Sequence, residues 1–422
     1  MIKSFAIYTV AGALNKMIPL LVLPVLTKYL APVEFGIWSI YQVLLTFVTP
    51  VVGMNSQANI TRKIFKIPQP ETAKLIGNLM AILSAMCCLF LLFFSIILFF
   101  TGDLFDIPKH WLQALPVFSF VTMVNQFNLT VLRNKDNPKL YGAYEIGVTV
   151  FNFAISLSLL LSKDFGWQSM ALGRLLASFT FATVSLLHLK ITGFFVFDFS
   201  YRVTKEVFCI SLPLIPHAVG GIVIQLSDRL FIDSMYGKSH VGLYTIGYTF
   251  GSALLLLTDS FNKAWSPWLY RQLAVLDKFR RRKIIRFTYL YAVFVFVLAI
   301  ALSIAARYMI DLFLDPAYGE SKVYVLWVSM AMAVQGMYFM MFPYPVHVGK
   351  TKFLGIITGV TAVINLIGNY LLIKLYGPIG AAQSTLISYV VLFLSVWWYS
   401  NRIYPMPWFR FKSQQRHTDR TG

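Results

Sequence analysis

The sequence is poor in charge: 13% of its 422 residues are Asp, Glu, Lys or Arg, whereas 58% are hydrophobic. Soluble globular domains carry about 25% charged residues. Apolar runs with the length of a membrane-spanning helix, roughly 20 residues, recur from end to end, and no long segment of ordinary soluble composition interrupts them. This scarcity excludes a separate soluble catalytic domain.

Catalytic and metal-binding motifs are also lacking. The three cysteines, Cys87, Cys88 and Cys209, all lie in apolar stretches and predict neither a disulfide framework nor a zinc site. The sequence has no metal-binding pair of histidines, no nucleophile elbow and no complete phosphate-binding loop. We therefore expect no enzymatic activity, no metal and no cofactor.

Apolar windows separated by turn residues predict about twelve membrane-spanning helices and hence an all-α polytopic membrane protein. The predicted spans are 5–30, 36–57, 75–100, 112–132, 141–161, 168–188, 207–228, 241–262, 287–306, 323–345, 353–373 and 379–399.

The net charge of +19 is distributed unevenly between the two sets of loops. Of the 36 Lys and Arg residues, 26 lie at the two termini and in the loops after even-numbered spans. By the positive-inside rule both termini are cytoplasmic. Anionic membrane lipids are the expected partners of this charge, and nucleic acid is not required as one. In the longest loop, 263–286, apolar and basic residues at helical spacing from Ser266 predict a helix lying in the membrane interface.

The two halves of the chain resemble each other weakly. Residues 34–40 match 240–246, Gly142 and Asn152 match Gly355 and Asn365, and Phe165–Gly166 match Tyr376–Gly377. The matches predict two six-helix bundles related by a pseudo-twofold axis normal to the membrane, an arrangement typical of alternating-access carriers. We expect bundles at 1–200 and 201–400, followed by a basic cytoplasmic tail at 401–422.

Charged residues inside predicted spans need an explanation, because each costs at least about 2.5 kcal/mol at the bilayer centre. Lys16 lies in the middle of the first span beside Asn15, on a face with other polar residues. It is suited to hold an anionic substrate group, the alternative being an internal carboxylate partner. Arg174 either lines the same cavity or extends towards the interface.

Other polar residues leave two interpretations open. His217 could relay protons or pack internally, and Asp259 and Glu145 could couple transport to an ion gradient or form structural pairs. Asp228 and Arg229 are expected to form a local ion pair at the outer end of span 7. Two groups of amides are suited either to sugar hydroxyls or to linking helices: Asn55, Gln57 and Asn59, and Asn125, Gln126 and Asn128.

Several segments resemble O-antigen and polysaccharide-biosynthesis flippases of the multidrug/oligosaccharidyl-lipid/polysaccharide exporter superfamily. These segments are Leu30–Ser39 (LAPVEFGIWS), Asp228–Ile232 (DRLFI), Val241–Tyr248 (VGLYTIGY) and Ala264–Tyr270 (AWSPWLY). The resemblance covers essentially the whole chain. It implies a bacterial inner-membrane protein that moves an undecaprenyl-pyrophosphate-linked oligosaccharide, such as an O-antigen unit of lipopolysaccharide, to the outer leaflet.

For such a substrate we expect roles for particular residues. Lys16, Arg174 and Arg229 would neutralise the diphosphate. A proton or sodium gradient would drive transport, and other membrane proteins of polysaccharide assembly would be partners.

Three alternatives remain open. A drug or cation antiporter of the same superfamily would be expected to carry a carboxylate in the first span, where this chain has Lys16. A membrane polymerase or glycosyltransferase would need a large outer loop or an acidic catalytic pair. A membrane scaffold would not need a buried lysine.

Overall fold

The computed structural model describes residues 2–162, 165–212, 214–274, 277–350 and 352–408, which form helices and connecting segments with no named β-strand. The elements are α1 (Ile2–Tyr29), α2 (Pro32–Val52), α3 (Gln57–Lys63), α4 (Gln69–Thr101), α5 (Lys109–Asn134), α6 (Pro138–Leu161), α7 (Gln168–Ile191), α8 (Tyr201–Ser211), α9 (Leu214–Tyr236), α10 (Lys238–Ser252), α11 (Leu254–Ala274), α12 (Lys278–Phe313), η1 (Pro316–Ser321), α13 (Lys322–Met341), α14 (Pro343–His347), α15 (Lys352–Tyr376) and α16 (Ile379–Ile403).

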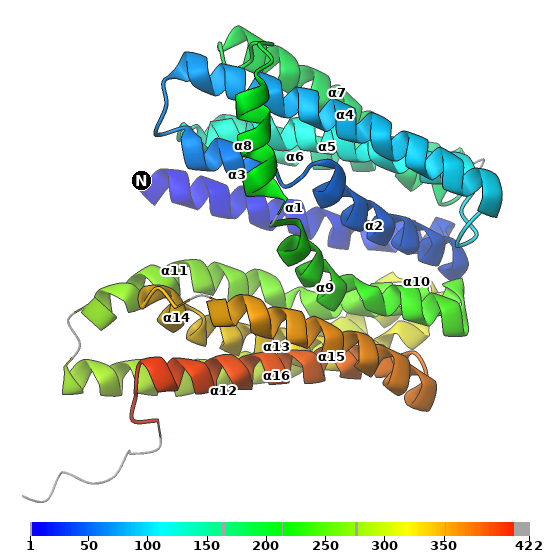
Figure 1. Ribbon diagram of the computed structural model, residues 1–422. Helices are drawn as coiled ribbons and strands as arrows, with labels where there is room; N and C mark the ends of the chain where they lie inside the picture. The colour runs from blue at the N-terminus through cyan, green and yellow to red at the C-terminus, as the bar shows by residue number, and fades with distance from the viewer. Residues whose placement is uncertain (1, 163–164, 213, 275–276, 351, 409–422) are drawn as a thin grey trace, which may run out of the picture.

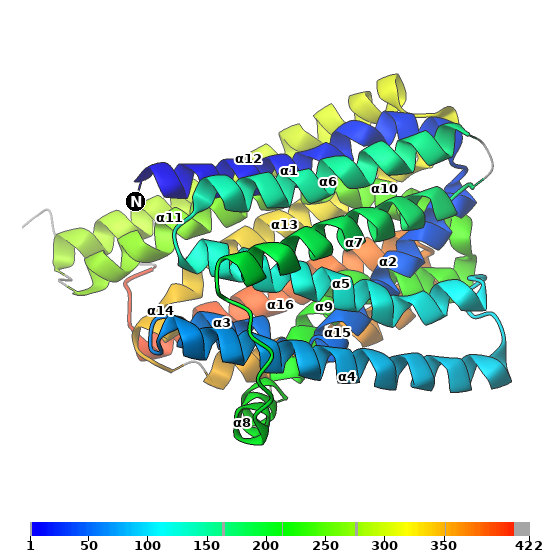
Figure 2. The ribbon, with the colours of Figure 1, turned by 90° about the horizontal axis from the view of Figure 1, so that it is seen from above.

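The long helices form two bundles, α1 to α7 and α9 to α16, which lie one above the other in Figure 1. Figure 2 shows the same arrangement from above. Among the described residues ten helices are long and apolar enough to cross a membrane, with α10 and α11 counted as one. The helices α1 and α9 run alongside them, one in each bundle (Figure 1). The predicted polytopic all-α fold with two bundles is therefore confirmed.

The prediction for the seventh span was wrong in its position. A short helix, α8, ends at Ser211, and the following long helix, α9, begins at Leu214 and continues to Tyr236. Helix α8 crosses the direction of the long helices (Figure 1) and is held to the N-terminal bundle by a 2.8 Å hydrogen bond from Asn59 Nδ2 to Ser211 Oγ. A hydropathy window does not separate the end of a short amphipathic helix from the beginning of a span. The end of α8 and the beginning of α9 were therefore predicted as one helix.

The predicted interfacial helix in 263–286 was also wrong. Ser266 and Pro267 lie inside α11, and the apolar residues of α11 that follow them pack against other helices, whereas Phe279 on α12 is exposed. Leu269 and Leu273 are buried, and Trp265 Nε1 donates a 3.2 Å hydrogen bond to the Met340 carbonyl on α13. The apolar face of this segment meets other helices, which periodicity alone does not distinguish from lipid.

The two bundles meet most closely where α2 crosses α10. A Cβ atom added to Gly36 would lie 1.9 Å from the Lys238 carbonyl oxygen, and one added to Gly242 would lie 2.0 Å from the Pro32 carbonyl oxygen. One turn further along both helices, the hydroxyls of Ser39 and Thr245 are 2.7 Å apart. Gly36 and Gly242 are equivalent positions of the predicted repeat, as are Ser39 and Thr245. Each residue therefore packs beside its own counterpart.

A second contact closes the same end of the molecule. The Tyr318 hydroxyl in η1 donates a 2.8 Å hydrogen bond to the Leu30 carbonyl at the end of α1, and its ring meets Phe35 edge to face. Tyr318 and Leu30 are both almost fully buried. We call these contacts, together with the Gly36–Gly242 and Ser39–Thr245 pairs, the α2–α10 junction.

Candidate functional site

A cavity of about 540 Å³ lies between helices of the N-terminal bundle and is bordered by the C-terminal bundle. Its walls come from α1, α2, α5, α6 and α7, and from α9 and α10 on the C-terminal side. The C-terminal contribution consists of Leu226, Arg229, Thr245 and Thr249. The cavity therefore belongs mainly to one half of a molecule whose two halves share a fold.

Amide and hydroxyl groups line much of the N-terminal wall. On α2 the lining residues Ser39, Gln42 and Thr46 recur at intervals of three or four and so share a helix face. The other neutral polar lining residues of this wall are Asn15, Thr122, Asn125, Gln126, Thr149, Asn152 and Ser178. Such groups both donate and accept hydrogen bonds, as the hydroxyls of a sugar require.

Arg174 on α7 supplies a positive charge to the N-terminal wall. It lines the cavity, and its Nη1 lies 3.5 Å from Gln42 Oε1 on α2, a long hydrogen bond. Asn15 and Glu145 line the same space, and Thr149 on α6 donates a hydrogen bond to Asn15 Oδ1 on α1. In the part of the chain that the structure describes, this wall contains one cation, one acid and several neutral polar groups.

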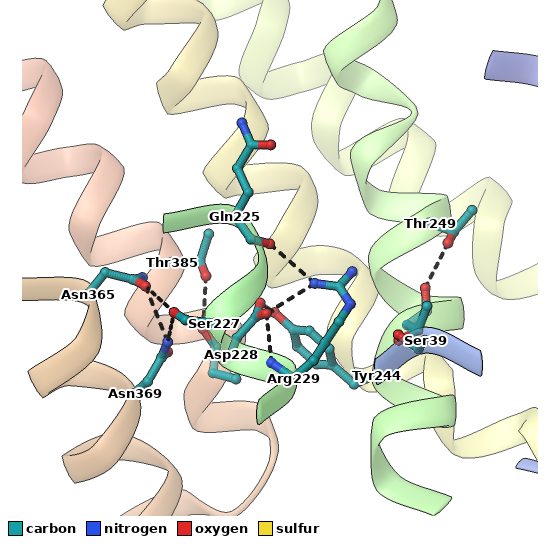
Figure 3. A network of polar contacts seen from close by, with 12 residues as sticks. Ser39, Gln225, Ser227, Asp228, Arg229, Tyr244, Thr249, Asn365, Asn369 and Thr385 are labelled. Atoms are coloured by element: carbon teal, nitrogen blue, oxygen red, sulfur yellow. Dashed lines mark hydrogen bonds and ion pairs between the residues drawn. The ribbon is translucent and has the colours of Figure 1, made fainter. Parts of the chain in front are cut away.

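Arg229 on α9 supplies the charge on the C-terminal side, and Figure 3 shows its surroundings. Its Nη1 donates to Asp228 Oδ1 at 3.0 Å and to the Gln225 carbonyl at 3.2 Å. Its guanidinium carbon lies 4.5 Å from the centre of the Tyr248 ring, within cation–π range. Its side chain is only 6% exposed, so the protein fixes its position at the edge of the cavity.

The corresponding part of the C-terminal bundle is filled by a buried polar network, also drawn in Figure 3. Ser227 Oγ donates a 3.2 Å hydrogen bond to Asn365 Oδ1, and Asn369 Nδ2 donates to both of these residues. Asn365 also donates to Ser388 Oγ on α16 at 3.2 Å. Ser227, Asn365 and Asn369 are all under 5% exposed. These side chains hydrogen-bond to one another and tie α9 to α15 and α16.

The structure brings four of the predicted site residues to the cavity: Asn15, Arg174, Arg229 and Glu145. Asp259 does not line it and instead pairs with Lys263 at 3.1 Å, with its side chain 32% exposed. The side chains of Lys16 and His217 lie outside the part of the chain that the structure describes.

The predicted amides divide between the two interpretations. Gln126 lines the cavity, whereas Asn128 donates to Ser185 Oγ at 3.2 Å and links α5 to α7. Asn125 does both, because it lines the cavity, donates to the Ser178 carbonyl at 3.1 Å and accepts from Ser185 Oγ at 3.0 Å. Asn59 is buried and links α3 to α8. The described residues contain no group of three or more His, Cys, Asp or Glu side chains placed to hold a metal ion.

Sequence analysis missed two features of the site. Asp228 was expected at the outer surface but is 1% exposed inside α9, because the helix continues to Tyr236. The sequence also did not predict that two aromatic rings of α10, those of Tyr244 and Tyr248, would surround Arg229. The spacing of Tyr244 and Tyr248, one helical turn apart, was the available signal.

Two comparisons place the chain among membrane proteins. A sequence model described as polysaccharide biosynthesis protein matches residues 1–272. The Haemophilus influenzae protein named Lsg locus putative protein 1 is 21% identical over 373 residues, covering 83% of this chain and 86% of that protein. A second protein of that organism, described as an uncharacterized membrane protein, is 21% identical over 363 residues, with 83% and 85% covered.

Solved structures show the same fold at low sequence identity. The lipid II flippase MurJ in an inward closed conformation has a TM-score of 0.70 at 14% identity, over 93% of this chain and 87% of that one. A Vibrio cholerae MATE transporter, VcmN, has a TM-score of 0.63 at 16% identity, with 95% and 96% covered. The arrangement of two bundles is therefore one that solved transporters adopt.

Proposed function

The chain belongs to the polysaccharide biosynthesis protein family, and from this premise we propose that it is a flippase for polyprenyl-diphosphate-linked oligosaccharides. The substrate would be an O-antigen or similar repeat unit carried on undecaprenyl pyrophosphate. The protein would move it from the inner to the outer leaflet of a bacterial cytoplasmic membrane. Membrane location and a transporter type of fold are common to the family and its structural neighbours.

One observation carries the proposal: the cavity combines a wall of amides and hydroxyls with two arginines at its border. The neutral polar groups suit sugar hydroxyls, and Arg174 and Arg229 suit phosphate oxygens, which guanidinium groups bind through charge-assisted hydrogen bonds. Lys16, on the same helix as the lining residue Asn15, would add a third cation. The polyprenyl tail would remain in the lipid.

The proposed cycle is alternating access between the two bundles. If both termini are cytoplasmic, as proposed, the α2–α10 junction would lie on the periplasmic side and would close the carrier on that side. A proton or sodium gradient is the proposed energy source, with Glu145, Asp259 and His217 as candidate coupling residues. Anionic lipids and other membrane proteins of polysaccharide assembly are the proposed partners.

The test follows a labelled polyprenyl-diphosphate oligosaccharide across proteoliposomes. We expect protein-dependent translocation, and a loss of about tenfold or more in each of Arg174→Ala, Arg229→Ala and Lys16→Ala, because a hydrogen bond to a charged group contributes about 1.5–3 kcal/mol. Arg307→Ala removes an exposed cation outside the cavity and should translocate normally.

A drug or cation antiporter is the second candidate, favoured by Glu145 in the cavity wall and by the likeness to VcmN. In that case the proteoliposomes would exchange an organic cation and leave the lipid-linked sugar untouched. Glu145→Gln would then abolish the exchange, and the three cation variants would retain it.

A further inference from the structure

Asp228 is a buried carboxylate that the proposed transport cycle has not yet used. Its side chain is 1% exposed, and it does not line the cavity. Its Oδ1 accepts hydrogen bonds from the Arg229 guanidinium at 3.0 Å and from the Arg229 backbone N–H at 2.8 Å. Its Oδ2 accepts a hydrogen bond from the Tyr244 hydroxyl. Asp228 therefore sits behind Arg229 as seen from the cavity.

Arg229 is bound on one side only. Of its three guanidinium nitrogens, Nη1 makes both of the hydrogen bonds described above, to Asp228 and to the Gln225 carbonyl. Among the described residues its Nε and Nη2 have no hydrogen-bond partner. Arg229 also lines the cavity, where a ligand could reach these nitrogens. A guanidinium offers five N–H donors in a planar fork. Most of that capacity remains available to a ligand in the cavity.

The charge of Arg229 poses a problem for any carrier of anions. With an anion bound, the ligand neutralises the guanidinium. Once the anion has left, the same guanidinium would remain uncompensated at membrane depth, where an unpaired charge costs several kcal/mol. The empty carrier must nevertheless return. A carboxylate within hydrogen-bonding distance of the arginine, but outside the cavity, removes that cost.

We propose that Asp228 is an internal competitor of the transported anion, holding Arg229 when the cavity is empty and releasing it to the phosphate oxygens of a bound ligand. The inference rests on the proposed function, because it requires an anionic substrate. It assigns Asp228 a positioning role: Asp228 does not touch the ligand and acts through Arg229.

The structure also shows what stabilises Asp228 after Arg229 turns to the ligand. The backbone N–H of Arg229 and the Tyr244 hydroxyl are independent of the guanidinium, so both oxygens of the carboxylate keep a donor. Two hydrogen bonds to an ionised carboxylate offset part of its desolvation. Exchange of Arg229 between the two anions would then be a side-chain rotation that starts from the position seen here, with the guanidinium over the Tyr248 ring.

The experiment measures binding of farnesyl diphosphate, a short isoprenoid diphosphate, to the full-length protein in nanodiscs, together with oligosaccharide-lipid turnover in proteoliposomes. In Asp228→Asn the competitor loses its charge, so the ligand should bind about tenfold more tightly or better, as expected for a charged hydrogen bond. Turnover should fall, because release slows and the empty carrier returns with an unpaired arginine.

A second variant has the opposite expected sign. Tyr244→Phe keeps the ring but removes one donor from Asp228, so the carboxylate holds Arg229 more strongly and diphosphate binding should weaken severalfold. A purely structural role would weaken binding in both variants. Asp233→Asn is the matched control. It disrupts another buried ion pair, between Asp233 on α9 and Lys238 on α10, which does not line the cavity, so the affinity for the diphosphate should stay unchanged.

The outcomes separate the two proposals. If the unmodified protein binds no diphosphate, both the proposed function and the role of Asp228 are wrong. If it binds diphosphate but Asp228→Asn binds equally or more weakly, only the competition is overturned. If Asp228→Asn does not fold, Asp228→Ser takes its place, because it also removes the competing charge, and equal or weaker binding there overturns the inference. An unchanged or tighter affinity in Tyr244→Phe overturns it as well.

Discussion

The two bundles share a fold but use their interiors differently. The N-terminal bundle is hollow, with Asn152 of α6 on the wall of the cavity, whereas the repeat-equivalent Asn365 of α15 is fully buried in a hydrogen-bonded network. The N-terminal bundle therefore presents polar groups to a cavity, and the C-terminal bundle uses them to hold its helices together. A repeated fold fixes where an amide lies, and its neighbours decide what the amide does.

The largest expected effect comes from preventing the bundles from separating at the α2–α10 junction. The double variant Ser39→Cys/Thr245→Cys, in a chain whose native cysteines are replaced, places two thiols where hydroxyls now lie 2.7 Å apart. Oxidation should form a disulfide and reduce translocation to the level of protein-free liposomes, with recovery on reduction. Each single-cysteine variant is the control. Full transport by the cross-linked protein would contradict separation at this junction.

A smaller effect should distinguish the filled bundle from the hollow one. Asn365→Ala removes the acceptor of the buried Ser227 hydroxyl on α9 and the donor to Ser388 on α16. We therefore expect a loss of about 2–4 kcal/mol in unfolding free energy, since each unsatisfied buried group costs about 1–3 kcal/mol. Asn152→Ala, at the equivalent position, should lose under about 1 kcal/mol because water in the cavity replaces its contacts. Denaturant unfolding of both variants in detergent measures the difference. Equal losses would show that the bundles do not differ in this way.

The smallest effect concerns one hydrogen bond across the cavity wall. Thr149→Val removes the donor to Asn15 while keeping the shape of the side chain. The freed amide oxygen faces the cavity, so we expect a change below about 1 kcal/mol in unfolding free energy. Ser227→Ala, in the buried network, is the matched comparison and should cost more. The comparison between the bundles would weaken if Thr149→Val proved the more damaging variant.

Much of the fold could be predicted from the sequence, because long apolar runs bounded by turn residues leave few alternatives to membrane-spanning helices. The repeat was visible at Gly36 and Gly242, although nothing in the sequence indicated that these two glycines touch. The errors lie where an apolar face meets protein instead of lipid, as at Trp265, or where a short amphipathic helix precedes a span, as at α8. Hydropathy records that a face is apolar and does not record what covers it.

The site was predicted less completely. Asn15, Arg174, Arg229 and Glu145 line one cavity because polar residues inside spans must face other helices or a polar space. The same rule does not separate an amide on a cavity wall, such as Gln126, from one that links helices, such as Asn128. That difference depends on how neighbouring helices are rotated. The position of Asp228 was predicted wrongly because the end of α9 was: the helix continues to Tyr236, so Asp228 lies in the interior and not at the outer surface.

The meeting of Gly36 with Gly242 has the form of an isologous contact, in which a surface pairs with a copy of itself. Two separate copies of one bundle could associate through such a contact as a homodimer. In a homodimer, however, every substitution appears twice, so one subunit cannot become hollow while the other becomes filled. Joining the copies in a single polypeptide removes that restriction. The junction preserves the symmetric contact, and the difference between the bundle with the cavity and the bundle with the buried network is the asymmetry that fusion allows.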